Sequence, residues 1–121
     1  NDKLLGGAGL DTLTGGTGSD QFYFQTALSA ASNVDRITDF SVVDDRLYID
    51  DAVFTKLGLG ALGMSYFSNS GYARDANDYI VYDKTTGTVS YDADGSGSAA
   101  AVKFATITAG LSLIAGDIVI F

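Results

Sequence analysis

Apolar residues in the first part of the chain recur at a fixed interval of nine residues. Leu4, Leu13 and Phe22 mark this interval, and each stands two positions after an aspartate. The alternation of polar and apolar side chains around Leu13 and Phe22 is typical of a short, half-buried β-strand. A turn and a short strand in every nine residues predict a stack of repeating units, a parallel β-roll with two strands per coil.

The repeating unit has the pattern Gly-Gly-x-Gly-x-Asp-x-apolar-x. Two complete copies lie at 6–14 (GGAGLDTLT) and 15–23 (GGTGSDQFY), and residues 1–5 are in phase as the tail of a third copy. Glycine lets the backbone turn through φ values that a Cβ would block, and it leaves carbonyl oxygens uncovered. Carbonyls and a carboxylate, with no His or Cys anywhere in the chain, form an oxygen-only ligand set that suits a hard cation such as calcium.

This nonapeptide resembles the calcium-binding repeat of the repeats-in-toxin (hemolysin-type) family. The resemblance implies that each Ca²⁺ lies between one turn and the turn two units later, on the same edge of the roll. The implied ligands are glycine carbonyls and aspartate carboxylates: Gly7, Gly9 and Asp11 on one edge, and Asp2, Gly16, Gly18 and Asp20 on the other. The turn expected to follow Asp11 on its edge, FQTALS at 24–29, lacks the motif. We therefore expect one or two incomplete sites.

Beyond Phe24 the repeat stops, and the pattern predicts further strands with irregular turns. Strands are predicted at 34–40, 46–50, 99–107 and 117–121, and a β-hairpin over 79–91 with its turn at 84–87. Residues 51–57, DAVFTKL, predict a short helix that begins at an aspartate and ends before Gly58.

The expected fold class is all-β, in one compact unit of 121 residues. Residues 1–24 are expected to form the end of a calcium-binding parallel β-roll. Residues 25–121 are expected to continue and cap that roll as a β-rich C-terminal module with one short helix.

The second part of the chain also resembles the same family. Residues 78–97 are similar to the module that closes many of its secreted members, and residues 35–40 resemble the strand after the last repeat of serralysin-type proteases. The segment Asp117–Phe121, an aspartate followed by four apolar residues, is similar to the terminal signal read by type I (ABC-transporter) secretion systems. The resemblance implies a bacterial protein secreted without an N-terminal signal peptide, and we expect this chain to be a C-terminal fragment of a larger one.

Composition narrows the possible functions. All fifteen acidic residues are aspartates, against seven Lys plus Arg, which gives a net charge of −8. This charge makes nucleic acid an unfavourable partner, and it opposes compaction until cations neutralise it. No apolar run is long enough to span a membrane. Without histidine the usual base for a serine nucleophile is absent, so no catalytic residues are expected and the chain is not expected to be an enzyme.

These observations favour a calcium-binding module whose folding depends on calcium and which serves type I secretion. The sequence leaves open whether Asp35, Asp39, Asp44, Asp45, Asp50 or Asp51 bind calcium or act as turn formers and helix caps. Asp92 and Asp94 stand at the first and third positions of an EF-hand-like loop, but a glycine occupies position four and Lys103 occupies position twelve. A hairpin turn is the favoured interpretation there.

Two further functions are compatible with the sequence. A carbohydrate or cell-surface binding module would use exposed tyrosines, with Tyr66, Tyr72, Tyr79 and Tyr82 as candidates. Aromatic residues in strands more often form cross-strand pairs. Self-association is a third possibility, because the first unit of the roll would leave an open sheet edge that can pair with another copy.

Overall fold

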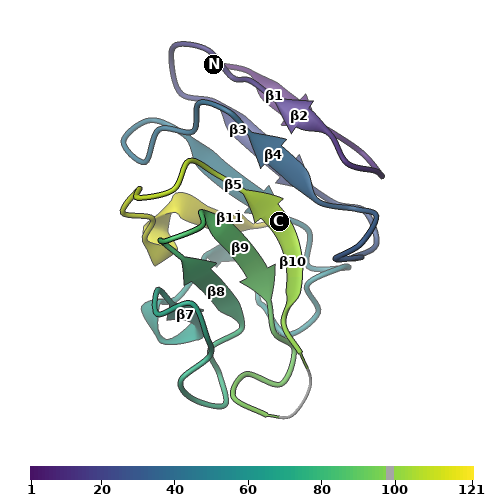
Figure 1. Cartoon of the computed structure of the whole chain (residues 1–121), viewed down its shortest axis with the longest axis vertical. Helices are drawn as coiled ribbons and strands as arrows, with labels where there is room; N and C mark the ends of the chain where they lie inside the picture. Colours follow the sequence, from purple (N-terminus) through teal and green to yellow (C-terminus); the bar gives the residue numbers. More distant parts are fainter. Residues whose placement is uncertain (98–99) are drawn as a thin grey trace.

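The fold is built almost entirely from short β-strands. The computed structural model describes residues 1–97 and 100–121. Its eleven strands are β1 (Lys3–Leu5), β2 (Thr12–Leu13), β3 (Gln21–Phe24), β4 (Asp35–Ile37), β5 (Arg46–Ile49), β6 (Gly60–Ala61), β7 (Phe67–Ser68), β8 (Ile80–Asp83), β9 (Thr88–Tyr91), β10 (Val102–Thr106) and β11 (Ile118–Ile120) (Figure 1). Two 3-10 helices, η1 (Met64–Tyr66) and η2 (Ala115–Asp117), complete it. The prediction of a β-rich chain is confirmed.

The strands form two sheets, and the first five strands alternate between them. One sheet has the order β1-β3-β5-β11-β6 and the other β2-β4-β10-β9-β8-β7. The pairs β1–β3, β3–β5, β5–β11, β2–β4 and β4–β10 are parallel. The pairs β11–β6, β10–β9 and β8–β9 are antiparallel. Both sheets are therefore mixed, and β1 and β2 are edge strands.

The register of the first sheet explains the nine-residue apolar pattern. Leu4 pairs with Phe22, Phe22 with Leu47, and Leu47 with Ile118. The last three of these side chains have no exposed surface. Burial of each contributes about 1.5–3 kcal/mol, so this row of apolar residues fixes the order in which the parallel strands stack.

Aromatic side chains fill the space between the two sheets. Phe54 is fully buried, and its ring lies 4.9 Å from that of Phe104 and 5.1 Å from that of Tyr91, both edge-on. Phe104 also contacts Phe24 edge-on at 5.2 Å. Because Phe24 ends the repeats and Phe104 lies on β10, these contacts join the repeats to the C-terminal strands.

The predicted helix at 51–57 is wrong, because this segment consists of turns. The Asp50 carbonyl accepts the amides of Val53 and Phe54, which is a single helical turn. The amide of Lys56 then donates to the Tyr91 hydroxyl at 3.1 Å, so the helical hydrogen-bond pattern does not continue. The apolar side chains of the segment still face the core.

The predicted hairpin is confirmed by the antiparallel pairing of β8 with β9, from Ile80 opposite Tyr91 to Asp83 opposite Thr88. The strand predicted at 99–107 begins at Val102 in the structure, and Ala99 lies outside the described residues. The C-terminal strand β11 lies between β5 and β6 in the interior of its sheet. Within the described part of the chain, no helix is long and apolar enough to cross a membrane.

Candidate metal centre

The glycines of the repeat meet two different physical requirements. The second and fourth glycines, Gly7, Gly9, Gly16 and Gly18, have φ values of 80°, 123°, 82° and 102°, which a side chain would strain. The first glycine of each unit has no such φ. A Cβ on Gly6 would lie 2.6 Å from Asp35 Oδ2 and 3.0 Å from Asp11 Oδ2, and one on Gly15 would lie 2.6 Å from Asp20 Oδ2. The first glycine therefore makes room for carboxylates.

On one edge of the fold, two carboxylates meet above Gly6. Asp35 is 4% exposed, and its Oδ1 accepts the backbone amide of Asp11 at 3.2 Å. Asp11 Oδ2 is buried without a hydrogen-bond partner. Burial raises the pKa of Asp35 to about 6, and the nearby Asp11 charge adds to this rise against the opposing effect of the Asp11 amide. The pair is therefore an electrostatically costly arrangement in the absence of a cation.

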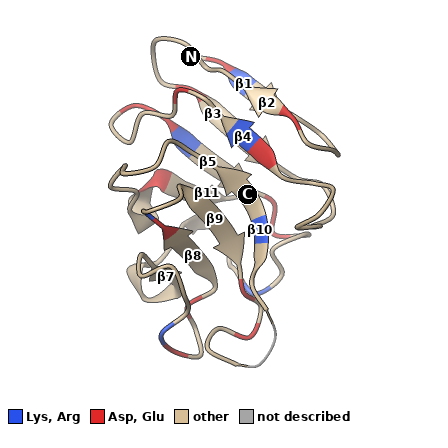
Figure 2. Cartoon of the chain, in the orientation of Figure 1, with Lys and Arg blue, Asp and Glu red and all other residues tan. Residues whose placement is uncertain are grey.

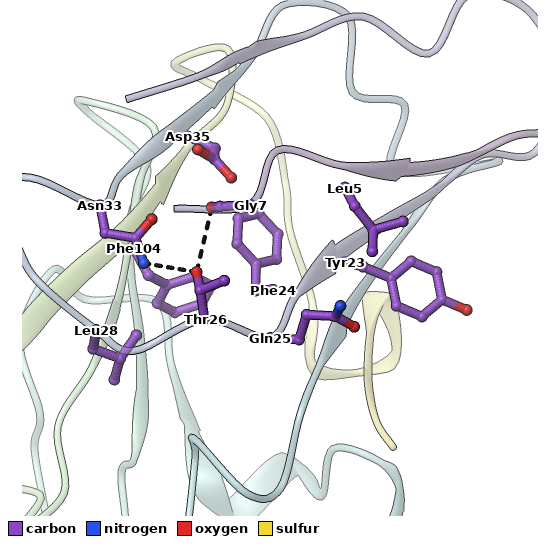
Figure 3. A pocket seen from close by; sticks show the side chains of 10 residues that line it. All are labelled: Leu5, Gly7, Tyr23, Phe24, Gln25, Thr26, Leu28, Asn33, Asp35 and Phe104. Atoms are coloured by element: carbon purple, nitrogen blue, oxygen red, sulfur yellow. Dashed lines mark hydrogen bonds between the residues drawn. The ribbon is translucent and has the colours of Figure 1, made fainter. Parts of the chain in front are cut away.

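Residues from Thr26 to Asp35 complete this edge, and they extend beyond the expected FQTALS turn at 24–29. Thr26 donates to the Gly7 carbonyl at 3.3 Å, and Asn33 donates to the Thr26 hydroxyl at 2.8 Å (Figure 3). Asn33 Oδ1 also accepts the Gly9 amide at 3.2 Å. The chain makes an extra loop before it returns at Asn33 and Asp35, so the partner of Asp11 is 24 residues away. The tail of the motif, Asp-x-apolar, reappears in Asp35-Arg36-Ile37, which is the signal that could have identified Asp35.

The opposite edge repeats the same contact between successive aspartates. Asp20 Oδ1 accepts the Asp2 amide at 2.7 Å, and Asp45 Oδ1 accepts the Asp20 amide at 2.9 Å. Asp20 is 1% exposed, and its Oδ2 is buried without a hydrogen-bond partner. The amino group of Asn1 lies 3.4 Å from Asp20 Oδ1. The structure therefore places the Asp2 backbone amide, but no described contact of its exposed side chain, against Asp20, and it adds Asp45 to this edge.

The turn of the second repeat is held by a carboxylate from the segment that follows β4. Asp39 accepts the amides of Gly15 at 2.9 Å and Gly16 at 2.7 Å. The Ser19 amide donates to Asn1 Oδ1 at 2.9 Å, beside Gly18. Gly16 and Gly18 thus lie between Asn1 on one side and Asp39 on the other.

Three of the remaining aspartate candidates lie in or directly beside turns outside the repeats. Asp44 is exposed and contacts the Ser41 hydroxyl at 3.3 Å. Asp50 Oδ1 accepts the Ala52 amide at 2.9 Å, as a turn former does, and Asp51 is exposed. Figure 2 shows that the acidic residues lie mainly in turns and at strand ends.

The donor set fits a hard cation only if backbone oxygens take part. No group of three or more His, Cys, Asp or Glu side chains in residues 1–97 and 100–121 is arranged to hold a metal. The first edge brings two carboxylates together, those of Asp11 and Asp35, and the second offers the free oxygen of Asp20, whereas calcium takes six to eight oxygen ligands. Carbonyls of the turn glycines and water would have to supply the rest. Asp11 Oδ2 and Asp20 Oδ2 provide the independent sign of a missing partner, because a buried charged oxygen without one is costly.

The tyrosines do not form one exposed row. Tyr82 is only 1% exposed, and its hydroxyl donates to the Leu111 carbonyl at 2.7 Å, so its assignment to a binding face is wrong. Tyr66 stacks on Tyr79 with ring centres 5.7 Å apart. Tyr66 and Tyr72 keep 40% and 64% of their surface exposed. A carbohydrate-binding face that uses these tyrosines would have to rely on the rings of Tyr66 and Tyr72.

The C-terminal aspartate is part of the folded core. Asp117 is 3% exposed, and its Oδ2 accepts the Ile114 amide at 3.0 Å. Its Oδ1 lies 3.5 Å from the guanidinium of Arg46. The segment Asp117–Phe121 is therefore not a free tail in the folded chain.

Comparison with known proteins gives no relative from which a function could be transferred. No protein-family model matches the chain, and no curated protein matches it significantly. The repeat residues and the geometry around Asp11 and Asp20 are therefore the features of this chain that bear on its function.

Proposed function

We propose that this chain is a calcium-binding module, not itself catalytic, whose folding depends on calcium and which belongs to a larger secreted protein. In this proposal β1, β3, β5 and β11, together with β2, β4 and β10, form the final coils of a parallel β-roll. The observation that carries the proposal is the pair of orphaned oxygens on Asp11 and Asp20. Both belong to the sixth residue of a repeat, and both turn back towards the first glycine of that repeat.

The chemistry of the two edges favours calcium over other metals. Only oxygen donors are present, because the chain has no His and no Cys. Oxygen-only sites prefer Ca²⁺ or Mg²⁺ to zinc or copper. Magnesium demands near-ideal octahedral geometry, whereas calcium tolerates irregular sets of carbonyls, carboxylates and water. A site with two carboxylates is expected to be weak, in the range that extracellular modules use.

Calcium binding at these edges would add directly to the free energy of folding. Without a cation, the Asp11–Asp35 pair and the net charge of −8 oppose the compact state. An ion that binds only the folded chain stabilises it by about 2.7 kcal/mol at a concentration 100 times its Kd. Two such sites would contribute a large part of the marginal stability of a domain of this size.

The position of the C-terminal strand supports a link between folding and export. Asp117 is buried, and β11 is paired on both sides. An exporter that reads Asp117–Phe121 would therefore have to do so before the chain folds. Low calcium inside the cell would keep the chain open for type I secretion, and higher calcium outside would fold it.

The test compares calcium uptake and folding in the natural chain and in two variants of equal charge. The variant D11N/D20N removes both orphaned carboxylates, and the control D44N/D51N removes two exposed ones. We expect circular dichroism to show a calcium-induced gain of β-structure in the natural chain and the control, and titration calorimetry to show reduced uptake in D11N/D20N. A fully folded spectrum in EDTA, with no calcium uptake, would overturn the proposal.

A further inference from the structure

A second acidic pair, of which one member is buried, lies far from the repeats in the turn that follows β9 (Figure 1). Asp92 is 6% exposed, and its Oδ1 is buried without a hydrogen-bond partner. Burial raises the pKa of Asp92 to about 6, and the hydrogen bond with Asp94 and the charge of Asp94 add to this rise. The two carboxyl groups are thus close together, the buried one of Asp92 and the exposed one of Asp94.

No ion pair in the described part of the chain supplies a positive charge to the Asp92 carboxylate. None of the ion pairs among residues 1–97 and 100–121 involves Asp92, and the nearby Arg74 lies 3.9 Å from Asp78 instead. The amides of the turn serve the backbone: Gly95 donates to the Asp92 carbonyl, Ser96 to that of Asp75 and Gly97 to that of Asp94. Asp92 Oδ1 therefore has no ion-pair partner and accepts none of the amides of Gly95, Ser96 and Gly97.

The turn is held rigidly against a neighbouring loop. Gly95 has a φ of 61°, and a Cβ there would lie 2.6 Å from the Asp75 carbonyl oxygen and even closer to that of Ala76. Only glycine allows this approach. Two backbone carbonyls, in addition to the two carboxylates, thus lie beside the turn.

We propose that the turn at 92–97 binds a calcium ion through the carboxylates of Asp92 and Asp94, independently of the repeats. The Ala76 carbonyl oxygen and water would supply further ligands, as calcium accepts, because the Asp75 carbonyl already accepts the amides of Asp78 and Ser96. Calcium would replace the missing partner of Asp92 Oδ1 and remove the repulsion between the two carboxylates. This site would fix the end of the β8–β9 hairpin to the loop that precedes it.

The geometry differs from that of an EF-hand loop. Asp92, Asp94 and Ser96 occupy positions one, three and five, and Gly97 occupies position six, where an EF-hand needs its glycine for a sharp turn. In this structure the left-handed glycine is Gly95, at position four, and Gly97 does not have a positive φ. Position twelve is Lys103, so no bidentate Glu is present. We therefore expect millimolar affinity, as in extracellular modules.

The test follows backbone amide signals of the whole chain by NMR during a calcium titration at neutral pH. Signals of residues 93–97 report on this turn, and signals of residues 7–11 report separately on the repeats. We expect D92N to lose the calcium-dependent shifts at 93–97 and to keep those at 7–11, whereas the charge-matched control D51N keeps both. Asn preserves the shape of Asp92 and removes its desolvated charge, so D92N is expected to melt in EDTA at the same temperature as D51N or higher.

Two results would overturn the proposal. One is the absence of any calcium-dependent shift at 93–97 in the natural chain, which would leave a carboxyl pair that holds a proton. The other is an equal shift at 93–97 in D92N and D51N. Neither result depends on whether residues 7–11 respond, so failure of this site and failure of the repeat sites are distinguishable.

Discussion

Replacement of Asp35 by Asn is expected to have opposite effects on stability with and without calcium. Asp35 is not part of a complete repeat, yet its carboxylate lies beside Asp11 above Gly6. Asn preserves the size of the side chain and an oxygen that can accept the Asp11 amide. The substitution therefore removes a charge and leaves the packing and this hydrogen bond in place.

The size of the effect in EDTA follows from the pKa of Asp35, which is raised from 3.8 to about 6. At about 1.4 kcal/mol per pH unit this corresponds to roughly 3 kcal/mol opposing the folded state at neutral pH. Asp11 is partly exposed, so solvent screens the pair, and we expect a gain of about 1–2 kcal/mol in D35N. For a domain of this size the melting temperature would rise by roughly 5 °C.

With calcium present the sign reverses, because a ligand is lost. A site saturated at 100 times its Kd contributes about 2.7 kcal/mol, and D35N is expected to lose most of that increment. Urea unfolding of D35N and of the control D44N, each in EDTA and in millimolar calcium, measures both effects. The reasoning would be refuted if D35N kept the full calcium increment, or if it were less stable than D44N in EDTA.

Three further predictions concern the same edge and the core. Gly6→Ala is expected to weaken calcium binding at least tenfold in calorimetry, because the new Cβ would displace Asp35 Oδ2. The control Gly58→Ala, whose Cβ would have no atom within 4 Å, is expected to have no effect. Equal calcium affinities of the two variants would contradict this. The apparent calcium affinity is expected to be about tenfold weaker at pH 5 than at pH 7, because calcium competes with the proton on Asp35, whose pKa is about 6. Without calcium, the raised pKa of Asp35 means that the stability of the fold increases as pH falls from about 6 to about 4. A melting temperature in EDTA that does not change with pH would argue against this. Phe54→Ala is expected to lower the free energy of unfolding by about 3–5 kcal/mol in urea, against less than about 0.5 kcal/mol for the exposed Tyr72→Ala.

The periodic features of the chain could be predicted from sequence because local rules determine them. The nine-residue spacing correctly gives the strands around Leu4, Leu13 and Phe22, and the hairpin follows from two apolar runs around a glycine-containing turn. The segment at 51–57 has a helical apolar pattern, but it forms turns, and the Lys56 amide donates to the Tyr91 hydroxyl of a distant strand. No local rule contains that contact.

The candidate site was predictable where the motif is complete and not where the chain departs from it. Asp11 and Asp20 follow from their place in the repeat. Asp35 and Asp45 do not, because loops of variable length separate them from their partners, with spacings of 24 and 25 residues in place of 18. A search that keeps the spacing fixed misses them, whereas a search for Asp-x-apolar at variable spacing would have found both.

The aspartates along the two edges suggest how the calcium-dependent part of the fold ends. Asp20, Asp35 and Asp45 each accept the amide of an aspartate one coil earlier. In the repeats, the second oxygens of Asp11 and Asp20 are left without a donor. The second oxygen of Asp45 accepts the Ser41 amide at 2.9 Å. At Asp45 a backbone amide therefore takes the place that we propose for a cation at Asp11 and Asp20. In the proposed function, dependence on calcium is therefore expected of the repeats that carry Asp11 and Asp20, whereas Asp45 has its carboxylate satisfied without an ion.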